Sequence, residues 1–178
     1  MSRAAMLLAL SLAACGESAP RASEGALNET TPERAATVID HPRLALLPAE
    51  SAAVLRASRL PMLLPRDPAL LAGAVVTAGP RFTALSAQGE GFSVSVAGTD
   101  ARHELAEELP PPEPRDQVRG RPATFTVNDG IRTVSWDEAS VAWALDVECF
   151  DVERDARCAS DDYLRELAES LALVGGGP

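Results

Sequence analysis

The stretch 123–149, ATFTVNDGIRTVSWDEASVAWALDVEC, carries the strongest strand and turn signals of the chain. Apolar and polar residues alternate on both sides of Asp129-Gly130, a pair that favours two-residue hairpin turns. Such a turn sets apolar opposite apolar and hydroxyl opposite hydroxyl in four pairs: Phe125 with Val134, Ala123 with Trp136, Thr126 with Thr133, and Thr124 with Ser135. A three-residue turn over 128–130 would place Phe125 opposite Thr133 and mix the two faces. The sequence therefore predicts the shorter turn.

The longest alternation of the chain follows this hairpin, after a second turn at 137–139. One face carries Val141, Trp143, Leu145, Val147 and Cys149, and the other carries Ala142, Ala144, Asp146 and Glu148. A period of two residues is typical of a half-buried strand. Because this strand is the longest and most regular, we expect it at the centre of the sheet.

The residues before the hairpin predict further strands. Three prolines within 59–68 exclude a regular helix there and indicate an extended segment packed against the domain. Short apolar runs at 74–77 and 82–87, followed by the alternating run 92–97, each predict a strand.

A helix is expected close to the end of the chain. Ser160 is a favourable N-cap, and Gly175-Gly176-Gly177 would stop the helix. Between them, one apolar stripe consists of Leu164, Leu167, Ala168 and Leu171. The predicted fold class is therefore α+β, with a single antiparallel sheet of about six strands and the C-terminal helix packed on one face.

The chain has three cysteines, and two of them lie near this helix. Cys149 ends the predicted central strand and Cys158 precedes the helix. The two form an even pair, and residues 1–15 read as an export signal, so the simplest prediction for the pair is a disulfide. A metal site is the alternative, but eight residues separate the two cysteines and neither histidine is near them in sequence. No metal ligand set and no cofactor site is predicted.

The third cysteine ends an export signal. Arg3 provides a positive start, and the apolar run 4–12 is too short to span a bilayer as a helix. Leu12-Ala13-Ala14-Cys15 resembles the lipobox of bacterial lipoproteins. The resemblance implies cleavage before Cys15, lipid on its sulfur and acylation of the new amine. Gly16 stands where inner-membrane lipoproteins usually carry Asp, so the resemblance implies the periplasmic face of the outer membrane. An ordinary secretory signal is the alternative.

Composition then suggests four segments. Residues 1–14 form the predicted signal peptide, and 15–58 the lipidated N-terminus and a flexible tether, because 16–48 is rich in Ala, Ser, Glu, Thr and Pro with little periodic apolar content. Within that tether, 49–58 can form a short helix where the domain begins. Residues 59–174 form the predicted α+β domain, and 175–178 a flexible tail.

The charge of the chain narrows the classes of partner. It carries 26 acidic residues against 16 basic ones, all of them arginine, for a net charge of −10. An acidic domain without a basic patch argues against binding of nucleic acid or of anionic lipid by the folded part. The absence of lysine removes both the Walker lysine and the kinase strand lysine, which argues against nucleotide chemistry.

No catalytic residue is predicted. The sequence has no Gly-x-Ser-x-Gly elbow and only two histidines, His41 in the predicted tether and His103 in a polar stretch. Gly89-Glu90-Gly91 is interpreted as a turn. A carboxylate pair with glycosidase-type chemistry stays open, although no pair stands out.

The loop after Cys149 has a partial calcium-loop spacing. Asp151, Glu153, Asp155 and Asp162 occupy positions 1, 3, 5 and 12 of that count. However, Ala156 stands at the position that needs glycine, and Arg154 and Arg157 neutralise part of the charge. The sequence therefore favours a solvated acidic loop over a calcium site.

The two tryptophans leave two interpretations open. Trp136 and Trp143 lie on neighbouring predicted strands, on faces assigned to the core. Either they pack under the terminal helix, or they line an apolar pocket together with Leu164 and Leu167.

The C-terminal third also resembles a family. The hairpin, Val134-Ser135-Trp136, the strand that begins Val141-Ala142-Trp143-Ala144-Leu145 and the helix 163–171 are similar to an uncharacterised C-terminal sheet-plus-helix domain of bacterial membrane-anchored proteins. More distantly they resemble halves of periplasmic lipoprotein carriers and envelope-stress regulators. The resemblance brings no catalytic residue. Together with the lipobox-like signal and the lack of a catalytic signature, the leading hypothesis is a non-catalytic envelope lipoprotein, an accessory or scaffold protein that binds an envelope partner. The alternative is a carrier or sensor of an apolar ligand, such as a lipid or acyl chain.

Overall fold

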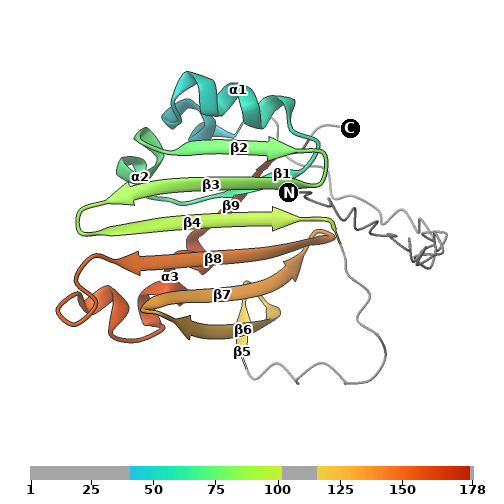
Figure 1. The fold of residues 1–178 in the computed structure, drawn as a ribbon. Helices are drawn as coiled ribbons and strands as arrows, with labels where there is room; N and C mark the ends of the chain where they lie inside the picture. Colours follow the sequence, from blue (N-terminus) through green and yellow to red (C-terminus); the bar gives the residue numbers. More distant parts are fainter. Residues whose placement is uncertain (1–40, 102–115, 177–178) are drawn as a thin grey trace, which may run out of the picture. The chain divides into compact units, whose positions relative to one another are not determined.

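Two antiparallel sheets carry the fold of this chain, whose computed structural model describes residues 41–101 and 116–176 (Figure 1). In spatial order the main sheet contains β2 (Val75–Gly79), β3 (Phe82–Gly89), β4 (Phe92–Thr99), β8 (Val141–Cys149), β7 (Ile131–Glu138), β6 (Arg121–Asn128) and β5 (Asp116–Val118). The second sheet pairs β1 (Pro61–Leu64) with β9 (Ala172–Gly175). The helical elements are η1 (Pro42–Leu46), α1 (Ala49–Ala57), α2 (Pro68–Ala72), η2 (Ala156–Cys158) and α3 (Asp162–Ser170).

The α+β class and the antiparallel sheet with a C-terminal helix are confirmed, whereas a single sheet of about six strands is wrong. The main sheet has seven strands, and a two-stranded sheet is added to it. The three-residue strand β5 is too short to show alternation in the sequence. It exists because Arg119-Gly120, both with positive φ of 54° and 69°, turn the chain directly into β6.

The predicted hairpin register is confirmed in full. β6 and β7 pair around Asp129-Gly130, and all four expected pairs are present. Both turn residues have positive φ, 49° and 83°, as the two-residue turn with left-handed central residues requires. β8 is the fourth of seven strands, so its central position is also confirmed.

One face of the main sheet forms the core. Alternate side chains of β3, β4 and β8 are buried there, among them Leu85, Val94, Val96, Leu145 and Val147. Figure 1 shows β1, β9 and α3 behind the sheet, on this inner side. α1 and α2 lie at the β2 end, where the Ser51 hydroxyl donates to the Ala74 carbonyl oxygen at 2.8 Å and accepts from the Val76 amide at 3.2 Å. Ser51 thereby occupies hydrogen-bonding groups of an edge strand that would otherwise be open.

The domain begins earlier in the chain than the sequence predicted. Residues 42–57, assigned to a flexible tether, form η1 and α1 in the described structure. Leu44 of η1, Leu47 directly after it and Leu55 of α1 are 4, 7 and 0% exposed within the same core. They are buried by contacts with segments that lie far away in the sequence, and no amphipathic run in 42–57 is long enough to predict that burial. The expected short helix at 49–58 corresponds to α1.

The end of the chain also differs from the prediction. The helix was expected to continue to the glycines, but α3 ends at Ser170, and residues 172–175 form β9. Gly175, assigned to a flexible tail, pairs with Pro61. The physical reason lies in β1: its four residues are all buried, so their backbone groups need a hydrogen-bonded partner strand.

The structure also has one helix that the sequence did not predict and a different N-cap for α3. α2 begins at Pro68, inside the segment expected to be extended, because the Asp67 side chain accepts from the Ala69 amide at 2.8 Å. The N-cap of α3 is Asp161 rather than Ser160. Ser160 lies one residue before this N-cap, and its hydroxyl accepts from the Asp162 amide at 3.3 Å.

Three aromatic rings lie across glycines of the neighbouring strand. The pairs are Gly79 with Phe82, Gly89 with Phe92, and Gly98 with Trp143, and each is a directly opposed pair of the ladder. A Cβ atom added to any of these glycines would overlap the ring. Glycine is therefore required at these positions for close packing of the ring on the backbone.

Gly98→Ala tests this packing. The added methyl group would force the buried Trp143 indole out of its position, and overpacking of this kind costs about 1–3 kcal/mol. Gly73→Ala is the matched control, because nothing lies within 4 Å of its added Cβ. We expect urea denaturation to show a lower free energy of unfolding for Gly98→Ala only. Equal stability of the two variants would contradict this account.

Candidate functional site

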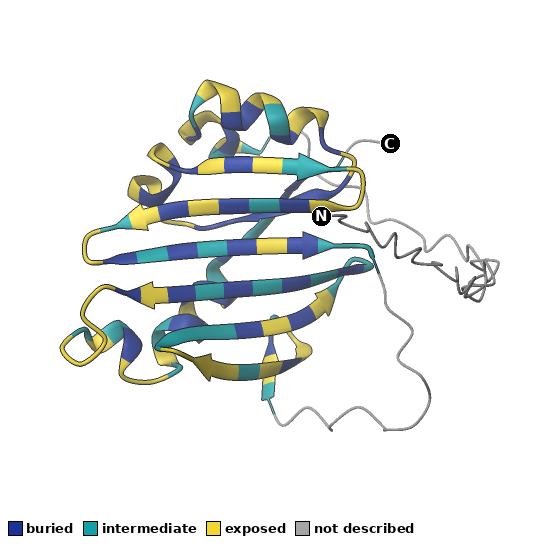
Figure 2. Ribbon diagram, viewed as in Figure 1, coloured by how far each residue is buried: buried dark blue, intermediate teal, exposed yellow. Residues whose placement is uncertain are grey.

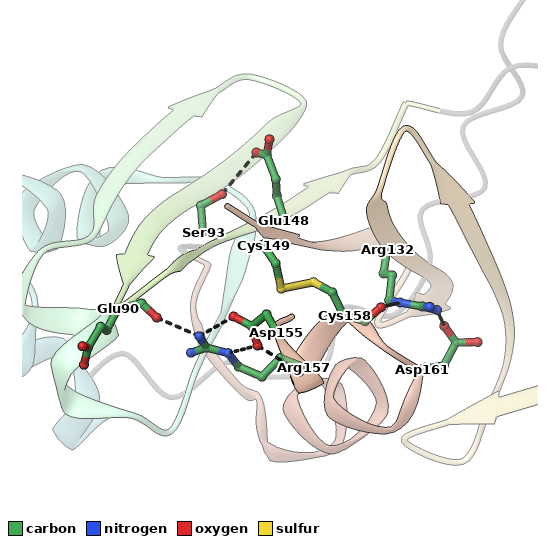
Figure 3. The surroundings of a disulfide bond; sticks show 9 residues. All are labelled: Glu90, Ser93, Arg132, Glu148, Cys149, Asp155, Arg157, Cys158 and Asp161. Carbon is green, nitrogen blue, oxygen red and sulfur yellow. Dashed lines mark hydrogen bonds and ion pairs between the residues drawn. A yellow bond between two sulfur atoms is a disulfide. The ribbon is translucent and has the colours of Figure 1, made fainter. Parts of the chain in front are cut away.

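The loop between β8 and α3 is closed by the predicted disulfide. Cys149 and Cys158 are bonded and both are 3% exposed, with their Cα atoms 6.2 Å apart. The disulfide prediction is therefore confirmed. Figure 3 shows Arg157 on one side of the bond and Arg132 on the other.

Arg157 connects this loop to the β3–β4 turn. Its guanidinium donates to Asp155 Oδ1 and Oδ2 at 2.8 and 2.6 Å and to the Glu90 carbonyl oxygen at 2.7 Å (Figure 3). It also lies 4.0 Å from the centre of the Phe92 ring, which forms a T-shaped pair with the Tyr163 ring at 5.7 Å between centres. The hydrogen bonds from Arg157 lower the pKa of Asp155 below its usual value.

The predicted acidic loop is thus organised by arginine. Asp155, one of the residues with calcium-loop spacing, is held by Arg157. Arg132 donates to the Cys158 carbonyl oxygen at 2.7 Å and to Asp161 at 2.6 Å. Within the described ranges, no three histidine, cysteine or acidic side chains gather as metal ligands would.

Removal of the disulfide tests its contribution to stability. The bond closes a loop with a sequence separation of 9, which corresponds to about 2.5 kcal/mol of chain entropy in the unfolded state. We expect the double variant Cys149→Ala/Cys158→Ala to lose this amount in urea denaturation, and wild type under reducing conditions to match it. Unchanged stability in both measurements would contradict the expectation.

A second arginine cluster joins the hairpins to the C-terminal segment. Arg119, in the β5–β6 turn, donates to both carboxylate oxygens of Glu138 at 2.6 and 3.0 Å and to the Leu171 carbonyl oxygen at 2.6 Å. Its amide donates to Glu169 of α3 at 2.7 Å. Glu138 also accepts from Trp136 Nε1 at 3.2 Å. Burial raises the pKa of Glu138, but these hydrogen bonds and the charges of Arg119 and Arg121 bring it below its usual value.

Glu138 is therefore expected to confer acid-sensitive stability. Its pKa is lower in the folded state, so its contribution is complete above the usual value of 4.5 and is lost as pH falls through the folded value. We expect Glu138→Gln to lower the free energy of unfolding at neutral pH by about 2 kcal/mol. Urea denaturation across pH should show this difference shrinking below pH 4.5. A difference that stays constant on acidification would contradict the prediction.

The four residues of the predicted apolar pocket lie in the core. Trp136, Trp143, Leu164 and Leu167 are 4, 2, 0 and 7% exposed and belong to one buried cluster. Both indole groups are fixed by Glu138, since Trp143 Nε1 donates to its backbone carbonyl oxygen at 3.1 Å. A ligand pocket among these four residues stays a prediction.

The outer face of the main sheet is the second candidate site. Its side chains alternate with the buried ones, and Figure 2 shows them as exposed or partly buried bands along the strands. No described helix lies in front of this face (Figure 1). Its central residues are small or carry carboxylates: Ala84, Ser86, Ser93, Ser95, Ala97, Thr99, Ala142, Ala144, Asp146, Glu148, Thr133, Ser135 and Asp137.

A hollow of about 270 Å³ opens on this face over β3, β4 and β8. Ala84, Ala97 and Ala144 form its floor, and Thr99 and Ala142 continue it on the next rung of the ladder. Phe82, 47% exposed with its ring across Gly79, stands at its β3 side. The hollow therefore combines a flat floor of small side chains with one exposed aromatic ring.

Carboxylates border the hollow on the β7 and β8 side. Asp137 is directly opposite Ala142, and Asp146 follows Ala144 on the same face of β8. Asp146 accepts from the Thr133 hydroxyl at 2.7 Å, and Glu148 accepts from Ser93 at 3.4 Å. Along the seven described strands of the main sheet, no outward position carries arginine. Arg81, in the β2–β3 turn, is paired with Asp100 at 3.0 Å.

The sequence contained part of this site. Alternation assigned Ala142, Ala144, Asp146 and Glu148 to one face, but neighbouring strands cannot be ordered from alternation alone.

A second hollow lies between α1 and the β2–β3 turn and is lined by Val54, Ala57, Ser58, Arg59, Ala78, Gly79 and Pro80.

The remaining candidate residues lie at a helix cap, in a turn or outside the described part of the chain. His41 accepts from the Arg43 amide at 3.2 Å and caps η1, so it belongs to the domain rather than to a tether. Gly89-Glu90-Gly91 joins β3 to β4, with positive φ at Gly91. Cys15 and His103 lie outside the described residues. Within the described ranges, no helix has both the length and the apolarity needed to cross a bilayer.

Comparison of the chain with protein-family models, with curated proteins and with solved structures finds no match.

Proposed function

We propose that this chain is a lipid-anchored, non-catalytic protein of the bacterial envelope whose folded domain binds an envelope protein. The observation that carries the proposal concerns the three cysteines. Cys149 and Cys158 are bonded to each other. Cys15, which follows the lipobox-like Leu12-Ala13-Ala14, is therefore the single cysteine available for lipid.

Compartment chemistry supports the same proposal. Disulfides form and persist in oxidising compartments such as the bacterial periplasm, and an export signal directs a chain there. Several acyl chains on one residue hold a protein durably on a membrane, since each buried methylene contributes about 0.8 kcal/mol. Gly16 favours the outer membrane, by the lipoprotein sorting pattern that the sequence resembles.

Binding of a protein is favoured over carriage of an apolar ligand by the distribution of side chains. The region between the sheet and α3, where a carrier would hold its ligand, contains Trp136, Trp143 and Leu164 at 4, 2 and 0% exposure. The outer face, in contrast, is an accessible surface with a hollow. Carriage of a lipid or acyl chain remains the second candidate.

Cys15→Ser tests the anchor. In a bacterium that processes lipoproteins, wild type should be found in the membrane fraction, and mass spectrometry should detect an acylated Cys15 as the first residue. Cys15→Ser should be found in the periplasmic fraction. The double variant Cys149→Ala/Cys158→Ala, which keeps Cys15, is the control and should remain with the membrane. Wild-type protein without acylation at Cys15 would contradict the proposal.

Solvent extraction separates the two candidate functions. Purified Cys15→Ser protein has no covalent lipid, so any lipid recovered from it by extraction was bound by the domain. We expect none in mass spectrometry of the extract. A stoichiometric lipid would instead support the carrier.

A further inference from the structure

We infer that the outer face of the main sheet docks an envelope protein that places an apolar side chain in the hollow and a lysine or arginine beside it. This inference rests on the proposed function and names the surface and the chemistry of the partner. Two features of the face carry it: the hollow beside Phe82, and the carboxylates that border it.

The hollow defines the apolar part of the contact. Its floor consists of Ala84, Ala97 and Ala144, whose methyl groups leave the backbone of three neighbouring strands close to the surface. Phe82 is 47% exposed beside it. At about 270 Å³ and open to solvent, the hollow is smaller than the clefts that enclose small-molecule ligands. It fits a single projecting side chain of a protein surface.

The charges define the polar part of the contact. Asp146 and Glu148 project on the same face of β8, where Asp146 accepts from the Thr133 hydroxyl and Glu148 from the Ser93 hydroxyl. No outward position on the described strands of the main sheet carries an arginine. The face therefore presents net negative charge beside an apolar hollow. Complementary charge across an interface gives specificity and speeds association, so a basic partner surface fits this face.

The same charges argue against two other occupants. A second copy placed face to face would bring these carboxylates toward identical carboxylates, and like charges in an interface are unfavourable. A membrane surface rich in anionic headgroups would be repelled for the same reason. A basic protein surface is the occupant that the charge of this face favours.

Site-specific photocrosslinking in cells tests the inference with the full-length lipidated protein. A benzophenone side chain replaces Ala97 in the hollow, or replaces Ala53 on the exposed side of α1 as the control position. We expect capture of a separate protein from position 97 and not from position 53. The captured peptide should contain lysine or arginine.

Charge neutralisation then tests the carboxylates. In the position-97 protein, Asp146→Asn/Glu148→Gln should lower capture by up to about tenfold, because each exposed ion pair contributes modestly. Glu166→Gln, which removes an exposed carboxylate from α3, is the matched control and should leave capture unchanged. Thermal denaturation of the purified variants confirms that they are folded.

Each other outcome overturns the inference. A crosslink to the same chain indicates an internal contact or a second copy, and a crosslink to lipid indicates a membrane surface. No crosslink from position 97, or capture that is unaffected by Asp146→Asn/Glu148→Gln, excludes a basic partner on this face. If position 53 alone captures a protein, the proposed function survives while this docking surface does not.

Discussion

The packing of Trp143 between two neighbouring strands is the interaction on which the rest of the structure depends. Its indole lies across Gly98 of β4, and Trp143 is directly opposite Trp136 of β7. It connects the first half of the main sheet to the second, because β4 and β8 are the junction between hairpins that come from different parts of the chain. The polar edges of both indoles are satisfied by Glu138. Glu138 in turn holds Arg119, which reaches α3 and the start of β9. Packing at the centre of the sheet is thereby linked to the closing segment.

Arginine connects segments that lie far apart in the sequence. Five arginines donate from the guanidinium to a backbone carbonyl oxygen that lies 21 or more residues away: Arg43 to Leu64 and Ser170, Arg119 to Leu171, Arg132 to Cys158, Arg157 to Glu90, and Arg165 to Gln117. Four of these arginines also form an ion pair with a carboxylate: Arg119, Arg132, Arg157 and Arg165. A planar group with five donors can serve a carbonyl and a carboxylate together, which a single ammonium does less well. This gives a structural role to the arginines of a chain without lysine.

The two faces of the main sheet have different roles. The inner face is covered by α3, β1 and β9, and it takes the large apolar side chains. The outer face has small side chains and carboxylates, and the arginines that serve the junctions lie elsewhere. Antiparallel sheets commonly keep one face packed and the other solvated. Here the solvated face also contains a hollow and a negative charge, which is why the proposed docking surface is placed there.

The sequence alone determined the features whose physics is local. The turn propensity of Asp129-Gly130 and the alternation around it set the hairpin register, and the alternation of 141–149 set the two faces of β8. Cys149 and Cys158, the even pair of cysteines in a chain with an export signal, predicted the disulfide, and the acidic side of β8, with Asp146 and Glu148, follows from the same alternation. Each of these depends on neighbours within about ten residues, so the pattern carries the information.

Only the tertiary structure decided the features that join distant segments. The pairing of β1 with β9, the membership of η1 and α1 in the core, and the contacts of Arg119 each join residues separated by long stretches of chain. Residues 172–174 resemble the end of a helix by composition, and become a strand because the buried backbone of β1 needs a partner. Likewise, the hollow exists only where β3, β4 and β8 lie side by side. Strand order is set by burial across the whole sheet, which no local pattern specifies.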